Sequence, residues 1–271
     1  MLAVVTVSVI GLILGVILVI AAKLMAVPVN QTAEDVRAVL PGANCGACGF
    51  AGCDDYAKKL AEDPNAKTNL CIPGGEPVAR QISEILGVEF AGVQDVKAFV
   101  KCAATFDTAE YKMDYQGPKT CKACSTFYKG RRGCTYGCLG FGDCVNVCKF
   151  GALSIENGLA VVDRDLCTGC GACAKACPQL LIALVKSDSL VRVCCSSHDK
   201  GAQVRKVCTA GCIGCMKCQK TCDFGAITVK DNLASIDPDK CTNCGKCAEA
   251  CPTKVIHIAG NGTCSGCASA Q

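Results

Sequence analysis

Residues 241–252 read CTNCGKCAEACP, and this stretch decides the fold. Its cysteines follow the spacing C-x2-C-x2-C-x3-C, and Pro252 comes directly after the last of them. Residues 167–178, CTGCGACAKACP, show the same spacing 74 positions earlier. That offset also relates an upstream group of cysteines, Cys134, Cys138, Cys144 and Cys148, to a second group, Cys208, Cys212, Cys218 and Cys222. This many cysteines in one register indicate a duplicated module.

The spacing is that of bacterial ferredoxins, in which three thiolates hold one [4Fe–4S] cluster and the fourth reaches the neighbouring cluster. Short strand-like segments at 153–155 and 227–229 fit a two-stranded framework beside each pair of clusters. Zinc is the alternative, but three successive x2 spacings with a trailing Cys-Pro do not suit a tetrahedral site. We therefore expect a multi-domain α+β protein with two tandem 2[4Fe–4S] ferredoxin-like modules, at 127–186 and 202–260.

The module at 202–260 follows the ferredoxin pattern without departure. One [4Fe–4S] cluster is expected on Cys212, Cys215, Cys218 and Cys251. A second cluster is expected on Cys222, Cys241, Cys244 and Cys247.

The module at 127–186 departs from the pattern, because Phe141 stands where the other copy has Cys215. We expect Cys134, which lies just upstream, to supply the missing thiolate, and its counterpart Cys208 to be a spare. The predicted clusters of this module are held by Cys134, Cys138, Cys144 and Cys177, and by Cys148, Cys167, Cys170 and Cys173.

A different cysteine motif lies nearer the N-terminus, in residues 45–53, CGACGFAGC. Together with Cys71 it gives Cys45, Cys48, Cys53 and Cys71 in the spacing C-x2-C-x4-C-x17-C. Its glycines allow the backbone to approach a cluster closely and to donate N–H groups to it. A zinc knuckle is the alternative. We expect a small, mostly helical [4Fe–4S] domain at 30–90, with a helix at 54–61, and five clusters in the whole chain.

Eight cysteines remain outside these sets: Cys102, Cys121, Cys124, Cys194, Cys195, Cys208, Cys264 and Cys267. Three of them, Cys102, Cys121 and Cys124, lie in a connector at 91–126 and could hold a sixth iron–sulfur centre with one more thiol. The adjacent pair Cys194-Cys195 lies in a linker at 187–201 and has no standard cluster spacing. Cys264 and Cys267 lie in the tail, 261–271, as bystanders or as ligands shared with a partner.

The composition agrees with small modules that depend on a cofactor. Of 271 residues 28 are Cys, whereas there are 8 Phe, 5 Tyr and no Trp, which is too little for one large aromatic core. The formal net charge is +4, and the Lys and Arg residues are scattered without a basic face. We therefore expect no nucleic-acid partner.

The N-terminal residues 2–22 carry no charged side chain, and Lys23 is the first cation. A helix of about 21 residues spans the roughly 30 Å hydrocarbon core of a bilayer. A cleaved signal peptide is the alternative, but no cation precedes the apolar run and the run is long for one. Because Lys23 and Arg37 follow the run, the positive-inside rule predicts a single-pass anchor at 1–24 with the iron–sulfur domains in the cytoplasm. That compartment is reducing and disfavours disulfides.

This order of parts resembles the B subunit of the Rnf complex. The resemblance rests on the apolar anchor, the motif at 45–53 with Cys71, and the two ferredoxin-like modules. The stretch at 137–145, GCLGFGDCV, is similar to the first module of the long form found in clostridia and related anaerobes. The resemblance covers essentially the whole chain.

The resemblance implies an electron-transfer subunit of an ion-translocating (Na⁺ or H⁺) ferredoxin:NAD⁺ oxidoreductase in the cell inner membrane. Soluble ferredoxin would be the electron donor, and the other Rnf subunits and the membrane would be partners. We expect no bond chemistry on an organic substrate and no catalytic residue. Because the domain at 30–90 follows the anchor, we expect electrons to leave through its cluster. A membrane-tethered polyferredoxin of a hydrogenase or reductase, or a metal-binding protein without redox function, are the alternatives.

Overall fold

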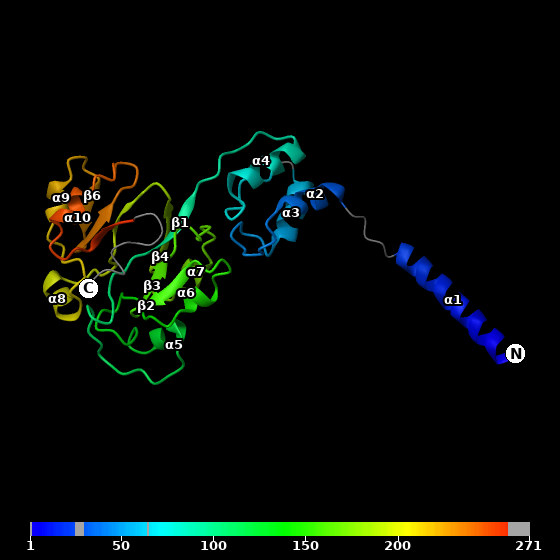
Figure 1. The fold of residues 1–271 in the computed structure, drawn as a ribbon, viewed down its shortest axis with the longest axis horizontal. Coiled ribbons are helices and arrows are strands. Elements are labelled where there is room, and N and C mark those ends of the chain that lie inside the picture. Colours follow the sequence, from blue (N-terminus) through cyan, green and yellow to red (C-terminus); the bar gives the residue numbers. More distant parts are fainter. Residues whose placement is uncertain (1, 25–29, 64, 260–271) are drawn as a thin grey trace.

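The computed structural model describes residues 2–24, 30–63 and 65–259. Cys264, Cys267 and the predicted tail lie outside these residues. Helix α1 (Leu2–Leu24) extends away from the rest of the chain (Figure 1). Among the residues whose side chains are described, no helix is long and apolar enough to cross a membrane.

A small helical domain follows α1 and lies between α1 and the remainder of the chain (Figure 1). It contains α2 (Gln31–Val39), α3 (Cys53–Glu62) and α4 (Gly75–Leu86). The predicted helix at 54–61 is confirmed as α3. Buried apolar side chains hold the three helices together, with Val36, Tyr56 and Ile82 at most 1% exposed.

Two copies of one small α+β unit make up the rest of the described chain. The first contains β1 (Val96–Val100), α5 (Cys121–Thr126), α6 (Asp143–Asn146), β2 (Leu153–Glu156), β3 (Leu159–Val162), α7 (Ala172–Ala176) and β4 (Ile182–Lys186). The second contains β5 (Val191–Val193), α8 (Gly201–Val207), α9 (Lys217–Thr221), β6 (Ile227–Lys230), β7 (Leu233–Ile236), α10 (Lys246–Ala250) and β8 (Ile256–Ile258).

Strand pairing shows how the two copies correspond. The central hairpins β2–β3 and β6–β7 are antiparallel, and each copy has a second antiparallel pair, β1–β4 or β5–β8. Ile182 of β4 pairs with Val100, and Ile256 of β8, 74 positions later, pairs with Val193. Strands β1 and β5 are therefore equivalent, although Val100 and Val193 lie 93 positions apart. The first copy is longer because it carries an extra segment that includes α5.

The pairing assigns both first strands to the modules that follow them. Strand β1 lies within the predicted connector 91–126, and β5 lies within the predicted linker 187–201. The cores of the two copies contain cysteines next to aliphatic side chains, for example Cys144 with Leu159, and Cys218 with Val255. The domain boundaries stay predictions.

Gly169 occupies the tight loop between Cys167 and Cys170, where β1 approaches from the side. Its φ is +73°, and a Cβ atom added there would collide with the backbone oxygen of Val96. Gly151 has a similar φ of +64°, but nothing lies within 4 Å of an added Cβ. An alanine would therefore strain the backbone at both positions, but its Cβ atom would clash with a neighbour only at position 169.

We expect Gly169→Ala to destabilise the iron-loaded protein more than Gly151→Ala, by a further ~1–3 kcal/mol, because only the first overpacks its surroundings. The measurement is the guanidinium unfolding transition under anaerobic conditions. Equal losses in the two variants would contradict the close approach of β1 to this loop.

Candidate functional site

The four cysteines predicted from the N-terminal motif come together in the helical domain. Burial, followed by the charges of Cys53, Cys48 and Cys45, raises the pKa of Cys71 to about 11, so the four thiols are electrostatic neighbours. The side chain of Asn44 accepts a hydrogen bond from the backbone N–H of Cys53, with 2.8 Å between the two atoms, and fixes the glycine-rich loop to the start of α3.

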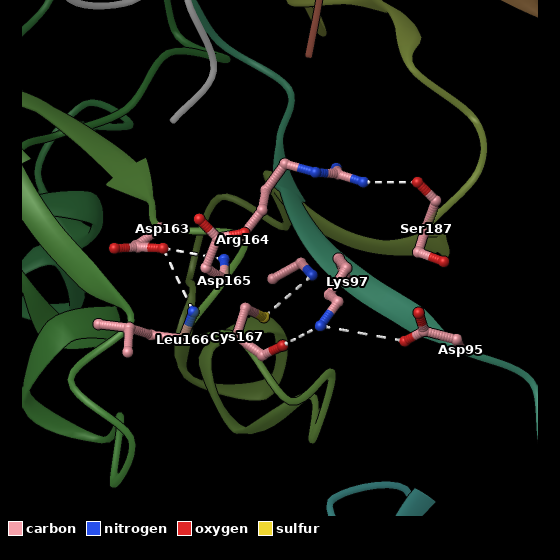
Figure 2. Close-up of polar contacts among 9 residues, drawn as sticks. Asp95, Lys97, Asp163, Arg164, Asp165, Leu166, Cys167 and Ser187 are labelled. Carbon is pink, nitrogen blue, oxygen red and sulfur yellow. Dashed lines mark hydrogen bonds and ion pairs between the residues drawn. The ribbon is translucent and has the colours of Figure 1, made fainter. Parts of the chain in front are cut away.

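Cys148, Cys167, Cys170 and Cys173 also come together, as predicted for the first ferredoxin-like module. Burial, followed by the charges of the other three thiols, raises the pKa of Cys173 to about 11. Strand β1 supports this group (Figure 2): Lys97 Nζ donates to the carbonyl of Cys167 at 2.7 Å. The backbone N–H of Ala98 donates to Cys167 Sγ at 3.4 Å.

The turn that leads into this cysteine loop is held by Asp163, whose carboxylate accepts the backbone N–H groups of Asp165 and Leu166 at 2.9 and 3.2 Å (Figure 2). Asp237 makes the same contact with Asp239 in the second module. The duplicated sequence therefore repeats the turn as well as the cysteines.

In the second module, each predicted set of four thiols lines a cavity of its own. One cavity is lined by Cys212, Cys215, Cys218 and Cys251, and the other by Cys222, Cys241, Cys244 and Cys247. Cys215 and Cys244 are exposed to solvent, unlike every other cysteine of the described residues. A redox partner in solution could therefore approach both sites closely.

In the first module, the structure regroups the thiols. Cys138, Cys144 and Cys177 line one cavity, as predicted, but the fourth cysteine of that cavity is Cys121 and Cys134 lies elsewhere. Cys121 begins α5, in the segment that the second module lacks. The carboxylate of Asp143 holds this short helix by accepting the backbone N–H groups of Cys121 and Lys122, both at 2.9 Å.

Phe141 leaves the first module one cysteine short at the position that Cys215 occupies in the second. It replaces the cysteine of the other copy and packs with Tyr115 against Cys121, Cys124 and Leu139. Phe141 together with an extra cysteine-bearing segment is the sequence signal for this substitution, but the spacing alone favours the nearer Cys134. Cys124 is fully buried in this apolar group.

The predicted extra centre on Cys102, Cys121 and Cys124 is not assembled. Cys102 instead lines a cavity between the two modules, together with Cys134, Cys194, Cys195 and Cys208.

These cavities fit iron–sulfur clusters in the chemistry of their donors. Every cysteine of the described residues is a free thiol, so each is available as a ligand. The cavities combine several sulfur donors with backbone N–H groups directed at sulfur, and both features are typical of [4Fe–4S] sites. Such a cluster supplies a one-electron redox centre, and the protein residues hold it and limit its exposure to water.

Comparison with known families agrees with this chemistry. Residues 211–255 match the 4Fe-4S dicluster domain, residues 160–182 match the 4Fe-4S binding domain, and residues 40–73 match an Fe-S cluster family. The chain therefore carries [4Fe–4S] cofactors.

Similar proteins extend over nearly the full chain. The B subunit of the ion-translocating oxidoreductase complex of Methanosarcina acetivorans is 45% identical, over 92% of this chain and 94% of that protein. The B subunit of the Na(+)-translocating ferredoxin:NAD(+) oxidoreductase complex of Acetobacterium woodii is 42% identical, over 92% and 75%. The B subunit of the proton-translocating ferredoxin:NAD(+) oxidoreductase complex of Clostridium ljungdahlii is 40% identical, over 96% and 92%.

Thiol titration tests the burial of these sites. Burial, followed by the charges of neighbouring thiols, raises the pKa of Cys71 to about 11 and that of Cys144 to about 12. These thiols therefore stay protonated at neutral pH until iron binds. We expect ultraviolet thiolate absorbance of the folded, cluster-free chain to rise in part between pH 10 and 12, whereas the guanidinium-unfolded chain should titrate near pH 9. Because the folded-state pKa values are raised, folding stability should fall as pH increases from near 9, where the unfolded thiols titrate, through the folded values of about 11 and about 12. Superimposable curves, with circular dichroism showing a folded chain, would contradict this burial.

Proposed function

The chain belongs to the family of B subunits of ion-translocating oxidoreductase complexes, and on that basis we propose that it accepts electrons from reduced ferredoxin in an ion-translocating ferredoxin:NAD⁺ oxidoreductase of the Rnf type. The observation that carries the proposal is the sequence identity of 40–45% to three such B subunits, which extends across the helical domain and both modules. The chain acts as the electron-transfer subunit of a translocase, with the other Rnf subunits as its partners.

Five cluster sites follow from the cavities and the thiol neighbourhoods described above. The first four-thiol set is Cys45, Cys48, Cys53 and Cys71. The first module supplies Cys121, Cys138, Cys144 and Cys177 for one cluster and Cys148, Cys167, Cys170 and Cys173 for the next. The second module supplies Cys212, Cys215, Cys218 and Cys251, and Cys222, Cys241, Cys244 and Cys247.

Interactions between neighbouring sets of cysteines support a continuous electron path through the helical domain and the first module. Burial, followed by the charges of neighbouring thiols that include Cys173 of the adjacent set, raises the pKa of Cys144 to about 12. Lys149, the residue after Cys148, donates its Nζ to the carbonyl oxygens of Ala43 and Asn44 at 2.7 and 3.1 Å. This contact joins the first module to the loop that begins the N-terminal motif.

Electrons enter at the second module and leave through the helical domain. The second module lies at the end of the chain opposite to α1 (Figure 1), and it bears the two exposed cysteines. Exposed lysines, Lys217 and Lys220, lie in α9 beside the exposed Cys215 and suit an acidic electron donor. The helical domain lies next to α1, where the membrane subunits would take over the electrons.

Helix α1 is the single-pass membrane anchor, with the iron–sulfur domains on the cytoplasmic side. Its sequence carries no charge from residue 2 to residue 22, and Lys23 lies in its last turn. Apolar side chains along it are solvent-exposed, among them Leu12 at 71% and Leu18 at 69%. The coupling ion differs between relatives of nearly equal identity, Na⁺ in one name and the proton in another, so similarity in this subunit does not indicate the ion.

The function is tested by Cys71→Ser in the assembled complex. We expect ferredoxin-dependent NAD⁺ reduction to fall by at least about 10-fold, because the last cluster before the membrane is lost. Low-temperature EPR should still show ferredoxin reducing the clusters of the second module. Cys124→Ser, a buried cysteine outside every proposed set, is the control and should retain activity. Wild-type NAD⁺ reduction in Cys71→Ser would exclude the proposed direction, and failure of ferredoxin to reduce any cluster would exclude ferredoxin as donor.

The regrouped first module is tested by iron analysis. We expect Cys121→Ser to lower the iron content by about 4 atoms per chain, because each cubane has four irons, and Cys124→Ser to leave it unchanged. Both residues lie in α5, so a general loss of that helix would affect both variants alike. Unchanged iron in Cys121→Ser would show that another thiol completes the set.

A further inference from the structure

We infer that Cys102, Cys134, Cys195 and Cys208 bind a sixth [4Fe–4S] cluster at the junction between the two modules. None of the three family matches, at 40–73, 160–182 and 211–255, includes any of these residues. The inference rests on the geometry of the thiols and does not depend on the identity of the electron donor.

The four thiols line one cavity. Cys102 and Cys208 are 5% and 9% exposed, and Cys134 and Cys195 are half-buried. The space at this site, including the part open to solvent, is about 360 Å³, similar to the 320, 330 and 380 Å³ of the cysteine-lined cavities in the modules. Burial, followed by the charges of the other three thiols, raises the pKa of Cys208 to about 12.

Each module contributes two cysteines to the site, and the two pairs occupy equivalent positions in the repeat. Cys134 and Cys208 correspond through the 74-residue offset. Cys102 and Cys195 correspond through the strand register, since each lies two residues after the strand end that pairs with Ile182 or Ile256. The duplication therefore brings equivalent residues of the two copies to one point.

Equivalent hydrogen bonds confirm this correspondence. The backbone N–H of Cys138 donates to Cys102 Sγ at 3.5 Å, and the backbone N–H of Cys212, its counterpart, donates to Cys195 Sγ at 3.4 Å. Donation of N–H groups to sulfur is a feature of protein-bound clusters, and it stabilises the thiolate.

Cys194 also lines the cavity, but it falls outside the symmetric set. The backbone N–H of Cys194 donates to Val255 at 2.8 Å, as that of Lys101 donates to Leu181 at 2.8 Å. Cys194 therefore corresponds to Lys101 and has no cysteine counterpart. The first module could not supply an equivalent ligand, so the symmetric set contains four thiols.

Arg132 provides an independent indication that an anion occupies this region. It is completely buried, and its guanidinium donates to the backbone oxygens of Ala104 and Gly158, both at 2.8 Å. Within the described residues it forms no ion pair, and its Nε has no hydrogen-bond partner. Its charge lowers the pKa of Cys102 and Cys134 against the larger effect of burial. A buried cation without a counter-charge is costly, and a cluster with four thiolates supplies the counter-charge.

The position of the sixth cluster closes the gap between the modules. Cys138, which contacts Cys102, belongs to a proposed site of the first module, and Cys212, which contacts Cys195, belongs to one of the second. The junction cluster would therefore be adjacent to one cluster on each side. Electrons could pass singly from the exposed second module to the first without leaving the protein interior.

Iron and acid-labile sulfide analysis of the purified, iron-loaded full chain tests the inference. We expect about 24 iron atoms per wild-type chain, from six cubanes, with an equal amount of sulfide. Cys102→Ala, Cys134→Ala, Cys195→Ala and Cys208→Ala should each lose about 4 irons and the same EPR-detected cluster. Cys194→Ala, in the same cavity wall, should lose none.

Three results would overturn the junction cluster: about 20 irons in the wild-type chain, zinc without the matching sulfide, or full iron content in Cys208→Ala. Equal iron loss in Cys194→Ala would overturn the four-thiol assignment. The wild-type iron count does not depend on whether a variant folds. Since these measurements use no ferredoxin, they can fail or succeed independently of the proposed function.

Discussion

The binding of buried cysteine thiolates to iron is the interaction on which the rest of this structure depends. Each module has only short helices and two-stranded sheets, and elements of this size are marginal in water by themselves. Cysteines occupy a large part of both module cores, in places where a larger domain would have aliphatic or aromatic side chains. Cluster binding therefore adds to the free energy of folding of each module.

Duplication explains both the regular and the irregular features of the cluster sites. The two modules share their strand pairing, their Asp-stabilised turns and the N–H contacts to Cys102 and Cys195. They differ where Phe141 replaces a cysteine in the first module. There the inserted α5 brings Cys121 to the cavity that Cys138, Cys144 and Cys177 line. In the proposed site, a cysteine lost from the repeat is thus replaced by one from an insertion, and the cavity keeps four cysteines.

The sequence was sufficient where ligands are close together along the chain. The cysteine spacing predicted the two sets of the second module, and the structure places each set around one cavity. The resemblance to the Rnf family is confirmed by relatives that cover nearly the whole chain. Cys121 could not be predicted, because it shares a cavity with the distant Cys177 only in the folded chain, where Asp143 holds α5 in place. The proposed junction site could not be predicted from the sequence either, because only the strand register shows that Cys195 and Cys102 are equivalent.

A single path of clusters from the exposed second module to the helical domain beside α1 is the central claim. Diffraction from the iron-loaded chain at the iron absorption edge tests it most directly. The predicted anomalous map has a separate iron peak in each four-cysteine site, including one between Cys102 and Cys195 at the junction. A map with iron in the modules and none at the junction would contradict the path.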